Sequence, residues 1–392
     1  MPSEPKNNMC MPPFPVRIAI AGGGTGGHLF PGIAIAQEIM TRKSKNRVLF
    51  ISTGKPFELA VLAETGFDHA SITSEGIKGR EWKNQAKAIV KIPLGIIESA
   101  GILRGFKPHL VLGVGGYSSG PVAVAAWLLG IKIALHEQNI IPGLANRLLV
   151  YLASRIYVSF ENTQAKLRSR NIRITGNPIR KEILQLIKAP NASAPDQTGD
   201  PQENRRLADL RPQKPFTVLV IGGSQGAHRI NMAVKEALHH FRANITFFFV
   251  HQTGAKDEDE IKAAYGDVGI PSEVKSFFHD MAQQYQRADL VICRAGATTV
   301  AEVTAIGKGV IFIPYPFAAD DHQALNARTL ADVGAAEMIL QKDLTGKLLA
   351  EKMEHYASHP AALSLMASRA KQFGRPHAAA AIVDDIYNLM AA

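Results

Sequence analysis

The sequence has few cysteines and no long unbroken hydrophobic run. Only two cysteines occur among 392 residues, Cys10 and Cys293, which excludes a disulfide framework or a thiolate metal cluster. The longest uncharged stretch, 108–131, is long enough to cross a bilayer, but glycines and Pro121 interrupt it, so we interpret it as strand, turn and helix. Residues 1–15 contain five prolines and no apolar segment, which predicts a loose tail and no signal peptide. We expect a reducing, cytoplasmic setting.

Acidic residues are too few to balance the basic ones. The chain has 44 Lys and Arg against 34 Asp and Glu, a net charge of +10 that favours an anionic partner: nucleic acid, phosphorylated metabolite or membrane surface. Hydrophobic residues make up 46% and charged residues 20%, as in globular proteins, and the length predicts two domains. Because no stacking-aromatic motif or basic recognition helix occurs, nucleic-acid binding is the weaker alternative and we expect no such partner.

Short β-branched runs alternate with helical patterns and then restart, which predicts two Rossmann-like α/β domains with parallel sheets. The predicted strands are 16–21, 47–52, 109–114, 132–136 and 155–158 in the first half, and 216–221, 246–251, 273–277, 289–293 and 310–314 in the second. We expect a first domain over 16–177 and a second over 178–374. A C-terminal helix of about 375–392 should pack back on the first domain, and the proline-rich segment 188–215 should be an exposed loop.

Each half opens with a strand, a glycine-rich turn and a helix. The first turn is GGGTGGH at 22–28, followed by a predicted helix of about 31–40, and the second is GGSQGA at 222–227. Glycines permit positive φ and close approach, and the free N–H groups of a helix start favour an anion. The two turns therefore predict a cleft that faces phosphate from both sides.

Common cofactor and catalytic motifs are missing. Gly22, Gly24 and Gly27 fit the dinucleotide pattern G-x-G-x-x-G, but the second strand ends in 51–55 without the acid that would bind the ribose. Neither turn ends like a Walker A loop. The thirteen histidines show no metal-binding spacing, and no Gly-x-Ser-x-Gly elbow occurs. A dehydrogenase, a P-loop enzyme and a zinc enzyme are thus disfavoured.

Further polar motifs follow predicted strands. The cluster at 113–121 is by itself a tight turn, whereas HEQN at 136–139 places four polar side chains where open α/β sheets bind ligands. After the strand 289–293, small residues begin a helix that suits a diphosphate, and Glu302 lies one turn along. Glu302 either accepts ribose hydroxyls or is an ordinary solvated acid. In the run 316–327, Gln323 and Asn326 share a helix face and are candidates to bind sugar hydroxyls.

Together these motifs resemble those of one glycosyltransferase family. In order they are GGGTGGH at 22–28, GGYSSGP at 115–121, HEQN at 136–139, GNPIR at 176–180, GGSQGA at 222–227, RAGATTVAE at 294–302 and DDHQALNA at 320–327. The set resembles the MurG family of peptidoglycan N-acetylglucosaminyltransferases from Val16 to the C-terminus. The proline-rich tail and 188–215 depart from that pattern.

The resemblance implies a GT-B fold, with two Rossmann-like domains facing across a cleft, and an inverting transfer. N-acetylglucosamine would move from UDP-N-acetylglucosamine to the C4 hydroxyl of undecaprenyl-pyrophosphoryl-N-acetylmuramoyl-pentapeptide (lipid I), giving lipid II. The sequence itself predicts no metal site and no tightly bound cofactor, and it leaves assistance by magnesium open. The enzyme would lie peripherally on the cytoplasmic face of the inner membrane.

Site residues carry over by position from the resemblance. The implied donor contacts are Thr25, Gly26, Gly27, Asn139, Arg180, Ser224, Phe278, Ala297, Thr298, Thr299, Val300, Ala301, Glu302 and Gln323, and Gly116 and Tyr117 are on the acceptor side. Phe278 would meet uracil through its backbone and Glu302 the ribose. Asn139 and Gln323 would face the sugar, and Ser224 and Arg180 the diphosphate.

An inverting transfer also needs a base for the acceptor hydroxyl. His28 is the leading candidate because histidine titrates near neutrality, with Glu137 as the alternative. Equally, His28 caps the glycine loop or binds the acceptor pyrophosphate. The competing enzyme classes are a glycolipid glycosyltransferase and a UDP-N-acetylglucosamine 2-epimerase, and the HEQN and GGYSSGP segments argue by resemblance against both.

The segment 76–107 combines basic and apolar residues. Its cations are Lys78, Arg80, Lys83, Lys87, Lys91, Arg104 and Lys107. This pattern suits an anionic membrane surface, and Trp127 is a candidate to extend it. The alternative is an ordinary amphipathic helix with its apolar side in the core.

Overall fold

The chain divides into two compact units. The computed structural model describes residues 12–75, 82–167, 169–188, 214–223, 226–242 and 245–391, and gives only the backbone of 82–90. The first unit comprises 1–181 with 375–392, and the second comprises 182–374. Helix α7 (Lys181–Lys188) begins at that boundary. Each unit holds one parallel β-sheet, so the predicted architecture of two Rossmann-like α/β domains is confirmed.

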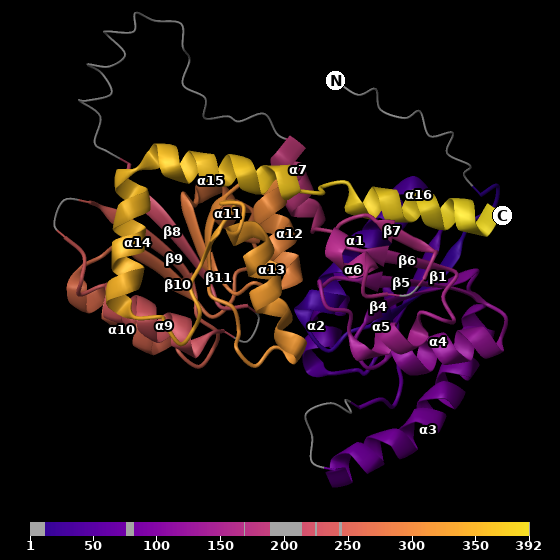
Figure 1. The fold of residues 1–392 in the computed structure, drawn as a ribbon. Coiled ribbons are helices and arrows are strands. Elements are labelled where there is room, and N and C mark those ends of the chain that lie inside the picture. Colours follow the sequence, from indigo (N-terminus) through magenta and orange to yellow (C-terminus); the bar gives the residue numbers. More distant parts are fainter. Residues whose placement is uncertain are drawn as a thin grey trace, which may run out of the picture. The chain divides into compact units, whose positions relative to one another are not determined.

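The sheet of the first unit has the order β3-β2-β1-β4-β5-β6-β7 (Figure 1). Its strands are β1 (Arg17–Gly22), β2 (Arg47–Ser52), β3 (Asp68–Ser71), β4 (Leu110–Gly115), β5 (Lys132–Glu137), β6 (Arg155–Val158) and β7 (Ile172–Ile174). The order reverses between β1 and β4, and the carboxyl ends of strands at such a point form the usual ligand site of an open α/β sheet.

Helices cover both faces of this sheet, which explains why its central strands are apolar along their whole length. The helices are α1 (Gly26–Arg42), α2 (Pro56–Thr65), α3 (Trp82–Phe106), α4 (Ser119–Leu128), α5 (Leu144–Leu149), α6 (Glu161–Gln164) and α16 (Ala378–Ala391). One core joins Ile20 of β1 to Ile33 of α1 and Ile382 of α16. The opposite core joins Val111 of β4 to α3 and α4. In Figure 1, α16 lies on one side of the sheet and α4 on the other.

Helix α16 is the last element of the chain and packs on α1. Arg42 and Asp384 form an ion pair at 3.0 Å, and the Asn46 side-chain amide donates to the Tyr387 hydroxyl at 3.0 Å. Both contacts are at least partly shielded from solvent, and Ile386 is fully buried beside them. The C-terminal helix thereby completes the core of the first unit.

The second unit has a sheet of order β10-β9-β8-β11-β12-β13, again with a reversal, between β8 and β11. Its strands are β8 (Phe216–Ile221), β9 (Phe247–Gln252), β10 (Ser272–Lys275), β11 (Leu290–Cys293), β12 (Gly309–Phe312) and β13 (Glu337–Met338). Its helices are α9 (His228–Ala237), α10 (Glu258–Val268), α11 (Met281–Arg287), α12 (Ala297–Ile306), α13 (His322–Ala331), α14 (Gly346–Ser358) and α15 (Pro360–Phe373). Cys293 is buried in β11 and Cys10 lies outside the described residues.

All ten predicted strands are present, with ends shifted by up to two residues. Three short strands, β3, β7 and β13, were not predicted because they lack a run of β-branched residues. The prediction for the first helix, 31–40, is wrong at its start: α1 begins at Gly26, inside the glycine motif. The stretch 108–131 forms β4, a turn and α4, as predicted. Within the described ranges, no helix combines the length and apolar character needed to cross a bilayer.

Candidate active site

The first and third glycine motifs meet at the reversal between β1 and β4. The N–H of Gly23 donates to the carbonyl of Gly115 at 3.4 Å. A side chain at Gly116 would collide with the carbonyl oxygen of Gly23, and both Gly115 (φ +94°) and Gly116 (φ +84°) adopt left-handed conformations. These positions require glycine because of both the close approach and the backbone angle. The glycine cluster of 113–121 is therefore more than a tight turn.

His28 lies in the first turn of α1, next to this contact. Its N–H donates to the Thr25 carbonyl at 3.2 Å, and its Nδ1 lies 3.3 Å from the Thr25 hydroxyl. A side chain at Gly115 would come within 2.5 Å of the imidazole carbon Cδ2. Thr25 and Gly27 are exposed and Gly26 is buried. The structure thus brings Thr25, Gly26, Gly27 and His28 together with Gly116 at the start of a helix.

Arg180 reaches the same helix from the end of the first unit. Its guanidinium lies over the Phe30 ring, 5.4 Å from the centroid. The Phe30 ring in turn packs against Gly26, where an added side chain would come within 2.9 Å of it. Tyr117, next to Gly116 in the chain, is 48% exposed, and its carbonyl accepts a hydrogen bond from Ser74 at 2.8 Å. A cation, a helix start and an exposed phenol thereby share one edge of the sheet.

Three of the four residues of the HEQN segment, His136 to Gln138, are buried. The Glu137 carboxylate accepts hydrogen bonds from the N–H of Asn139 (3.0 Å), the N–H of Gly143 (2.9 Å) and the side-chain amide of Asn146 (2.8 Å). Burial raises the pKa of Glu137, although these three hydrogen bonds act to lower it. Glu137 thus fixes the loop that follows β5. Asn139 is half-buried and is the member of the segment most open to a ligand.

His136 and Gln138 are also buried and serve the structure of this edge. The Gln138 side-chain amide donates to the Val114 carbonyl at 2.6 Å and lies 3.1 Å from Nδ1 of His136. Burial lowers the pKa of His136 to about 4 despite its contact with the Gly176 carbonyl, and the nearby His28 acts in the same direction. His136 is therefore neutral at physiological pH.

In the second unit, α12 begins at Ala297 directly after the loop that follows β11. Residues Thr298, Thr299 and Ala301 are half-buried, whereas Ala297 and Val300 are buried. Glu302 is only 2% exposed, and its Oε2 accepts a hydrogen bond from the Tyr285 hydroxyl at 3.1 Å. The interpretation of Glu302 as an ordinary solvated acid is therefore wrong.

The loop after β10 places Phe278 in the interior, 1% exposed, with its N–H donating to the Gln252 side chain at 3.1 Å. Gln323 accepts a hydrogen bond from the Tyr315 N–H at 3.0 Å, which fixes its side chain at the start of α13. The expectation that Asn326 contacts a sugar is not supported, because Asn326 is fully buried and donates to the Ala295 carbonyl at 3.2 Å. Ser224 lies outside the described residues.

Arg294 has a structural role that the sequence did not predict. Its guanidinium donates to the carbonyls of Ile313 (3.0 Å) and Pro314 (3.1 Å) and to the Gln341 side chain (2.7 Å). Burial lowers its pKa to about 10, so it keeps its charge. Arg294 thereby fixes the loop that leads to Tyr315. The sequence feature that could have pointed to Arg294 is its position directly after β11, at the carboxyl edge of the sheet.

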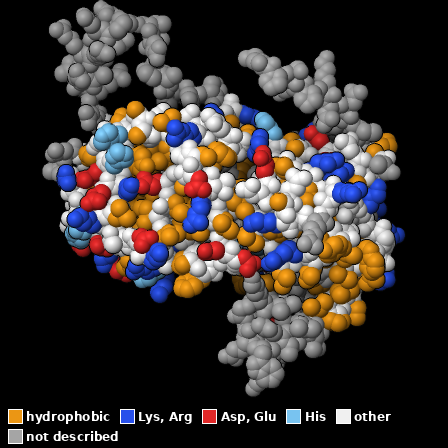
Figure 2. Space-filling view, in the orientation of Figure 1, with side chains coloured by type: hydrophobic (Ala, Val, Ile, Leu, Met, Phe, Trp, Pro, Cys, Tyr) orange, Lys and Arg blue, Asp and Glu red, His pale blue; other side chains and the backbone are white. Residues whose placement is uncertain are grey.

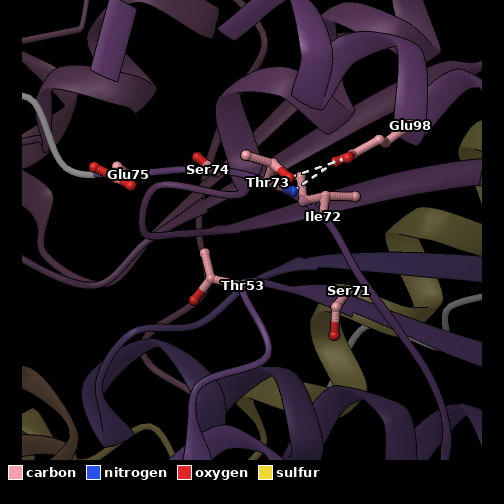
Figure 3. Close-up of a pocket in the computed structure, with 7 residues that line it drawn as sticks. All are labelled: Thr53, Ser71, Ile72, Thr73, Ser74, Glu75 and Glu98. Carbon is pink, nitrogen blue, oxygen red and sulfur yellow. Dashed lines mark hydrogen bonds between the residues drawn. The ribbon is translucent and has the colours of Figure 1, made fainter. Parts of the chain in front are cut away.

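A cavity of about 380 Å³ lies in the first unit, between the ends of β2 and β3 and helix α3 (Figure 3). It is lined by Thr53, Ser71, Ile72, Thr73, Ser74, Glu75 and Glu98. Figure 3 shows Glu98 directed at Thr73, which donates to it through its N–H (2.6 Å) and its hydroxyl (3.0 Å). Over the described ranges no cluster of three or more His, Cys, Asp or Glu side chains could hold a metal ion.

Comparison with known proteins identifies the family of the chain. The model of the glycosyltransferase family 28 N-terminal domain matches residues 18–158, and that of the C-terminal domain matches 217–382. A UDP-N-acetylglucosamine–N-acetylmuramyl-(pentapeptide) pyrophosphoryl-undecaprenol N-acetylglucosamine transferase of Syntrophus aciditrophicus is 45% identical over 94% of this chain and 97% of its own length. The Myxococcus xanthus protein of the same description is 42% identical over 96% of this chain and 93% of its own.

Solved structures give the same result for the fold. The crystal structure of Acinetobacter baumannii MurG superimposes with a TM-score of 0.73 at 30% identity, covering 95% of this chain and all of that one. A UDP-GlcNAc 2-epimerase from Neisseria meningitidis gives a TM-score of 0.63 at 13% identity over 95% of this chain and 99% of its own, which shows a shared fold alone. With relatives of such identity over nearly its whole length, the chain belongs to the MurG family of GT-B glycosyltransferases.

Proposed function

We propose that this protein transfers N-acetylglucosamine from UDP-N-acetylglucosamine to the C4 hydroxyl of the muramoyl sugar in lipid I, with inversion, and so forms lipid II. Family membership at 45% identity supports the reaction. The structural observation that carries the proposal is the contact of the first and third glycine motifs around His28 at the β1/β4 reversal. Open α/β sheets bind their ligands at such a reversal.

The nucleotide of the donor is assigned to the second unit. Glu302 accepts the two ribose hydroxyls, since its buried carboxylate has one oxygen oriented by Tyr285. The start of α12, residues Ala297–Ala301, receives the diphosphate through the N–H groups of its first turn. Because the N–H of Phe278 is taken by Gln252, any backbone contact of Phe278 with uracil falls to its carbonyl. Gln323, held by Tyr315, faces the sugar.

The first unit supplies the acceptor side and the remaining donor contacts. Thr25, Gly26 and Gly27 at the start of α1 and the guanidinium of Arg180 provide positive potential for the departing diphosphate. Gly116 and Tyr117 line the acceptor side of the same edge. Asn139 contacts the donor sugar. No metal or other cofactor is assigned a step, because these cationic and N–H groups can carry the charge of the leaving UDP.

His28 acts as the base that removes the proton of the acceptor hydroxyl. Its imidazole is half-buried at the edge, and its Nδ1 lies near the Thr25 hydroxyl. Glu137 is the poorer candidate because its carboxylate already accepts three hydrogen bonds from its own loop. A proton acceptor must reach the substrate, and the carboxylate of Glu137 is turned to the loop of its own chain.

The protein binds the cytoplasmic face of the inner membrane through an apolar surface on the first unit. Residues 76–81 lie outside the described residues, and α3 is described with its side chains from Lys91 onward. In this part of α3, Leu103 is buried in the core, as expected if α3 is an ordinary amphipathic helix. Other apolar side chains of α3 and of the next helices are exposed. These are Leu94 (48%) and Ile97 (69%) of α3, Trp127 (56%) and Leu128 (63%) of α4, and Leu148 (65%) and Tyr151 (78%) in and after α5.

Helix α3 packs on α4 and α4 on α5, so these side chains belong to neighbouring elements. Figure 2 shows hydrophobic side chains gathered over α4 and α5 on one face of the molecule. Exposed cations at Arg104 and Lys107 lie on the same segment. An exposed apolar patch with nearby cations suits an interface with anionic lipid, which is where a lipid-linked acceptor resides.

The reaction is tested by incubating the protein with labelled UDP-N-acetylglucosamine and a short-chain lipid I analogue. The proposal predicts a labelled lipid-linked disaccharide with a β-1,4 bond. The 2-epimerase alternative predicts conversion of the UDP sugar to its 2-epimer without any acceptor. Formation of the epimer and no disaccharide would overturn the proposal.

A further inference from the structure

We propose that Glu58 is a positioning residue that holds the first glycine motif in its working conformation. Helix α2 carries Glu58 in its first turn, 34 residues beyond Gly24, and its side chain is fully buried. The inference rests on the proposed function, because the loop it holds presents Thr25 to His28 to the substrates. Glu58 itself does not touch substrate.

The carboxylate of Glu58 binds the backbone on two sides. Oε1 accepts from the N–H of Gly24, and Oε2 accepts from the N–H of Lys55 at 3.1 Å, which caps α2. The Thr53 hydroxyl lies within hydrogen-bond distance of both oxygens, at 3.2 and 3.1 Å. Both carboxylate oxygens are therefore used, one for the glycine motif and the other for the start of α2.

The glycine motif is held between Glu58 and the third glycine motif. A side chain at Gly23 would collide with Oε1 of Glu58, and the carbonyl of Gly23 lies where a side chain at Gly116 would be. The loop thus has contacts on both of its sides at residues 23 and 24. Helix α1 begins two residues after Gly24, at Gly26, and His28 lies in its first turn. A shift of Gly24 would move His28 along with it.

The charge on Glu58 strengthens this contact. Burial by itself would raise the pKa of Glu58, but the hydrogen bonds from Lys55, Gly24, Ser52 and Thr53 hold the pKa below its ordinary value. Glu58 is therefore a carboxylate at neutral pH, and hydrogen bonds from N–H groups to a charged acceptor are stronger than those to a neutral one.

Glu58 also explains why the G-x-G-x-x-G pattern does not make a dinucleotide site. An acid near the end of the second strand normally binds the ribose of the cofactor. Here the acid comes slightly later, and its carboxylate binds the loop's own Gly24 N–H. The anion that the loop receives must then use N–H groups nearer the start of α1, such as those of Thr25 and Gly26.

Three substitutions separate the functions of the side chain. Glu58→Gln keeps the shape but has one accepting oxygen, so an NH₂ group must face the N–H of either Gly24 or Lys55. Glu58→Asp keeps the charge but is too short to serve both. Leu62→Ala is the matched control, because Leu62 is buried in the same helix and its apolar side chain cannot hydrogen-bond to the carboxylate. All three change α2, but only the first two change the support of Gly24.

The experiment measures turnover per folded molecule, affinity for UDP, and amide exchange of the peptide spanning 22–28. For Glu58→Gln we expect UDP affinity within twofold of wild type, since the nucleotide is assigned to the second unit. We expect kcat to fall about 10- to 100-fold, because small misplacements of reacting groups have such effects. Exchange at 22–28 should become faster. Leu62→Ala should show lowered stability with kcat and exchange at 22–28 close to wild type.

The inference is overturned if Glu58→Gln turns over at the wild-type rate with unchanged exchange at 22–28. It is also overturned if Leu62→Ala loses as much kcat as Glu58→Gln, since the effect would then be general destabilisation. Failure of the proposed function is a separate result: wild type would form no disaccharide. In that case amide exchange at 22–28 still decides whether Glu58 holds the loop.

Discussion

The hydroxyl of Tyr285 donates a hydrogen bond to Oε2 of Glu302 at 3.1 Å, and neither side chain is more than 2% exposed. The two residues come from different helices, α11 and α12, which flank β11. A buried carboxylate is costly unless it is hydrogen-bonded, so the phenol both stabilises Glu302 and orients it. One oxygen is thereby fixed, which prepares the carboxylate for the ribose of the donor.

Removing this phenol should weaken donor binding. For Tyr285→Phe we predict a rise in KM for UDP-N-acetylglucosamine of about 3- to 10-fold. A hydrogen bond to a charged group is worth about 1.5–3 kcal/mol, and only the part of this energy that orients Glu302 toward the donor affects donor binding. The matched control is Tyr265→Phe, which removes another buried hydroxyl of the same unit, bonded to His251 at 3.1 Å. Equal donor KM values in the two variants would contradict the role of Tyr285.

Removing the candidate base should slow the chemical step. For His28→Ala we predict a loss of about 10²- to 10⁴-fold in kcat, the range typical of general base catalysis, with little change in donor KM. Initial rates with both substrates varied separate the two parameters. An intact kcat with a raised acceptor KM alone would show that His28 binds the acceptor and does not take its proton.

Acid should destabilise the folded protein through its buried histidines. Burial lowers the pKa of His136 to about 4 and that of His251 to about 3, while the unfolded chain titrates near 6.5. Between pH 6.5 and 4 the unfolded state binds more protons, so stability falls as pH falls, at up to about 1.4 kcal/mol per pH unit for each histidine.

Urea unfolding of wild type and His136→Asn at a series of pH values tests this. Above pH 7.5 the free energies of unfolding of the two proteins should change with pH in the same way. Below pH 6 the free energy of unfolding of the variant should fall less per pH unit than that of wild type. The same slope for both proteins between pH 6 and 5 would show that His136 is not neutral in the folded state.

Charge placed in the exposed apolar surface should weaken membrane binding. For Leu148→Glu we predict a clear fall in the fraction of protein that floats with anionic vesicles, because the substitution removes apolar contact and adds a like charge. Leu365→Glu is the matched control, since Leu365 is also exposed (53%) but lies on α15 of the second unit. If the two variants bind vesicles equally, the surface over α3, α4 and α5 is not the membrane contact.

The sequence predicted the central strands well because helices bury them on both faces. Val111 and Leu112 of β4, for example, are fully buried and belong to a continuous apolar run. The short strand β13 has two half-buried residues, Glu337 and Met338, and gives no such signal. Helix α1 was predicted to start too late because Gly26 and Gly27 have poor helix propensity, which tertiary contacts override here.

The parts of the candidate site that the sequence predicted, such as the glycine motifs, are each formed by one continuous segment of the chain. The site was not predicted where a residue acts through a distant element. Glu58 supports Gly24 from another helix, Tyr285 orients Glu302, and Arg294 fixes the loop after β12. No spacing rule links such pairs, since tertiary packing brings them together. In HEQN, Glu137 and Gln138 serve to satisfy the backbone of their own edge, and the contact of Asn139 with the donor stays a prediction.

The central claim is tested most directly by transfer of labelled N-acetylglucosamine from its UDP donor to a short-chain lipid I analogue, with wild type and Glu302→Ala in parallel. We predict disaccharide product from wild type and a loss of about 100-fold or more in kcat/KM for the donor in the variant, since two hydrogen bonds to a buried carboxylate disappear. The acceptor KM should stay close to wild type. Wild type that binds the UDP sugar but transfers none of it, or a variant as active as wild type, would contradict the account.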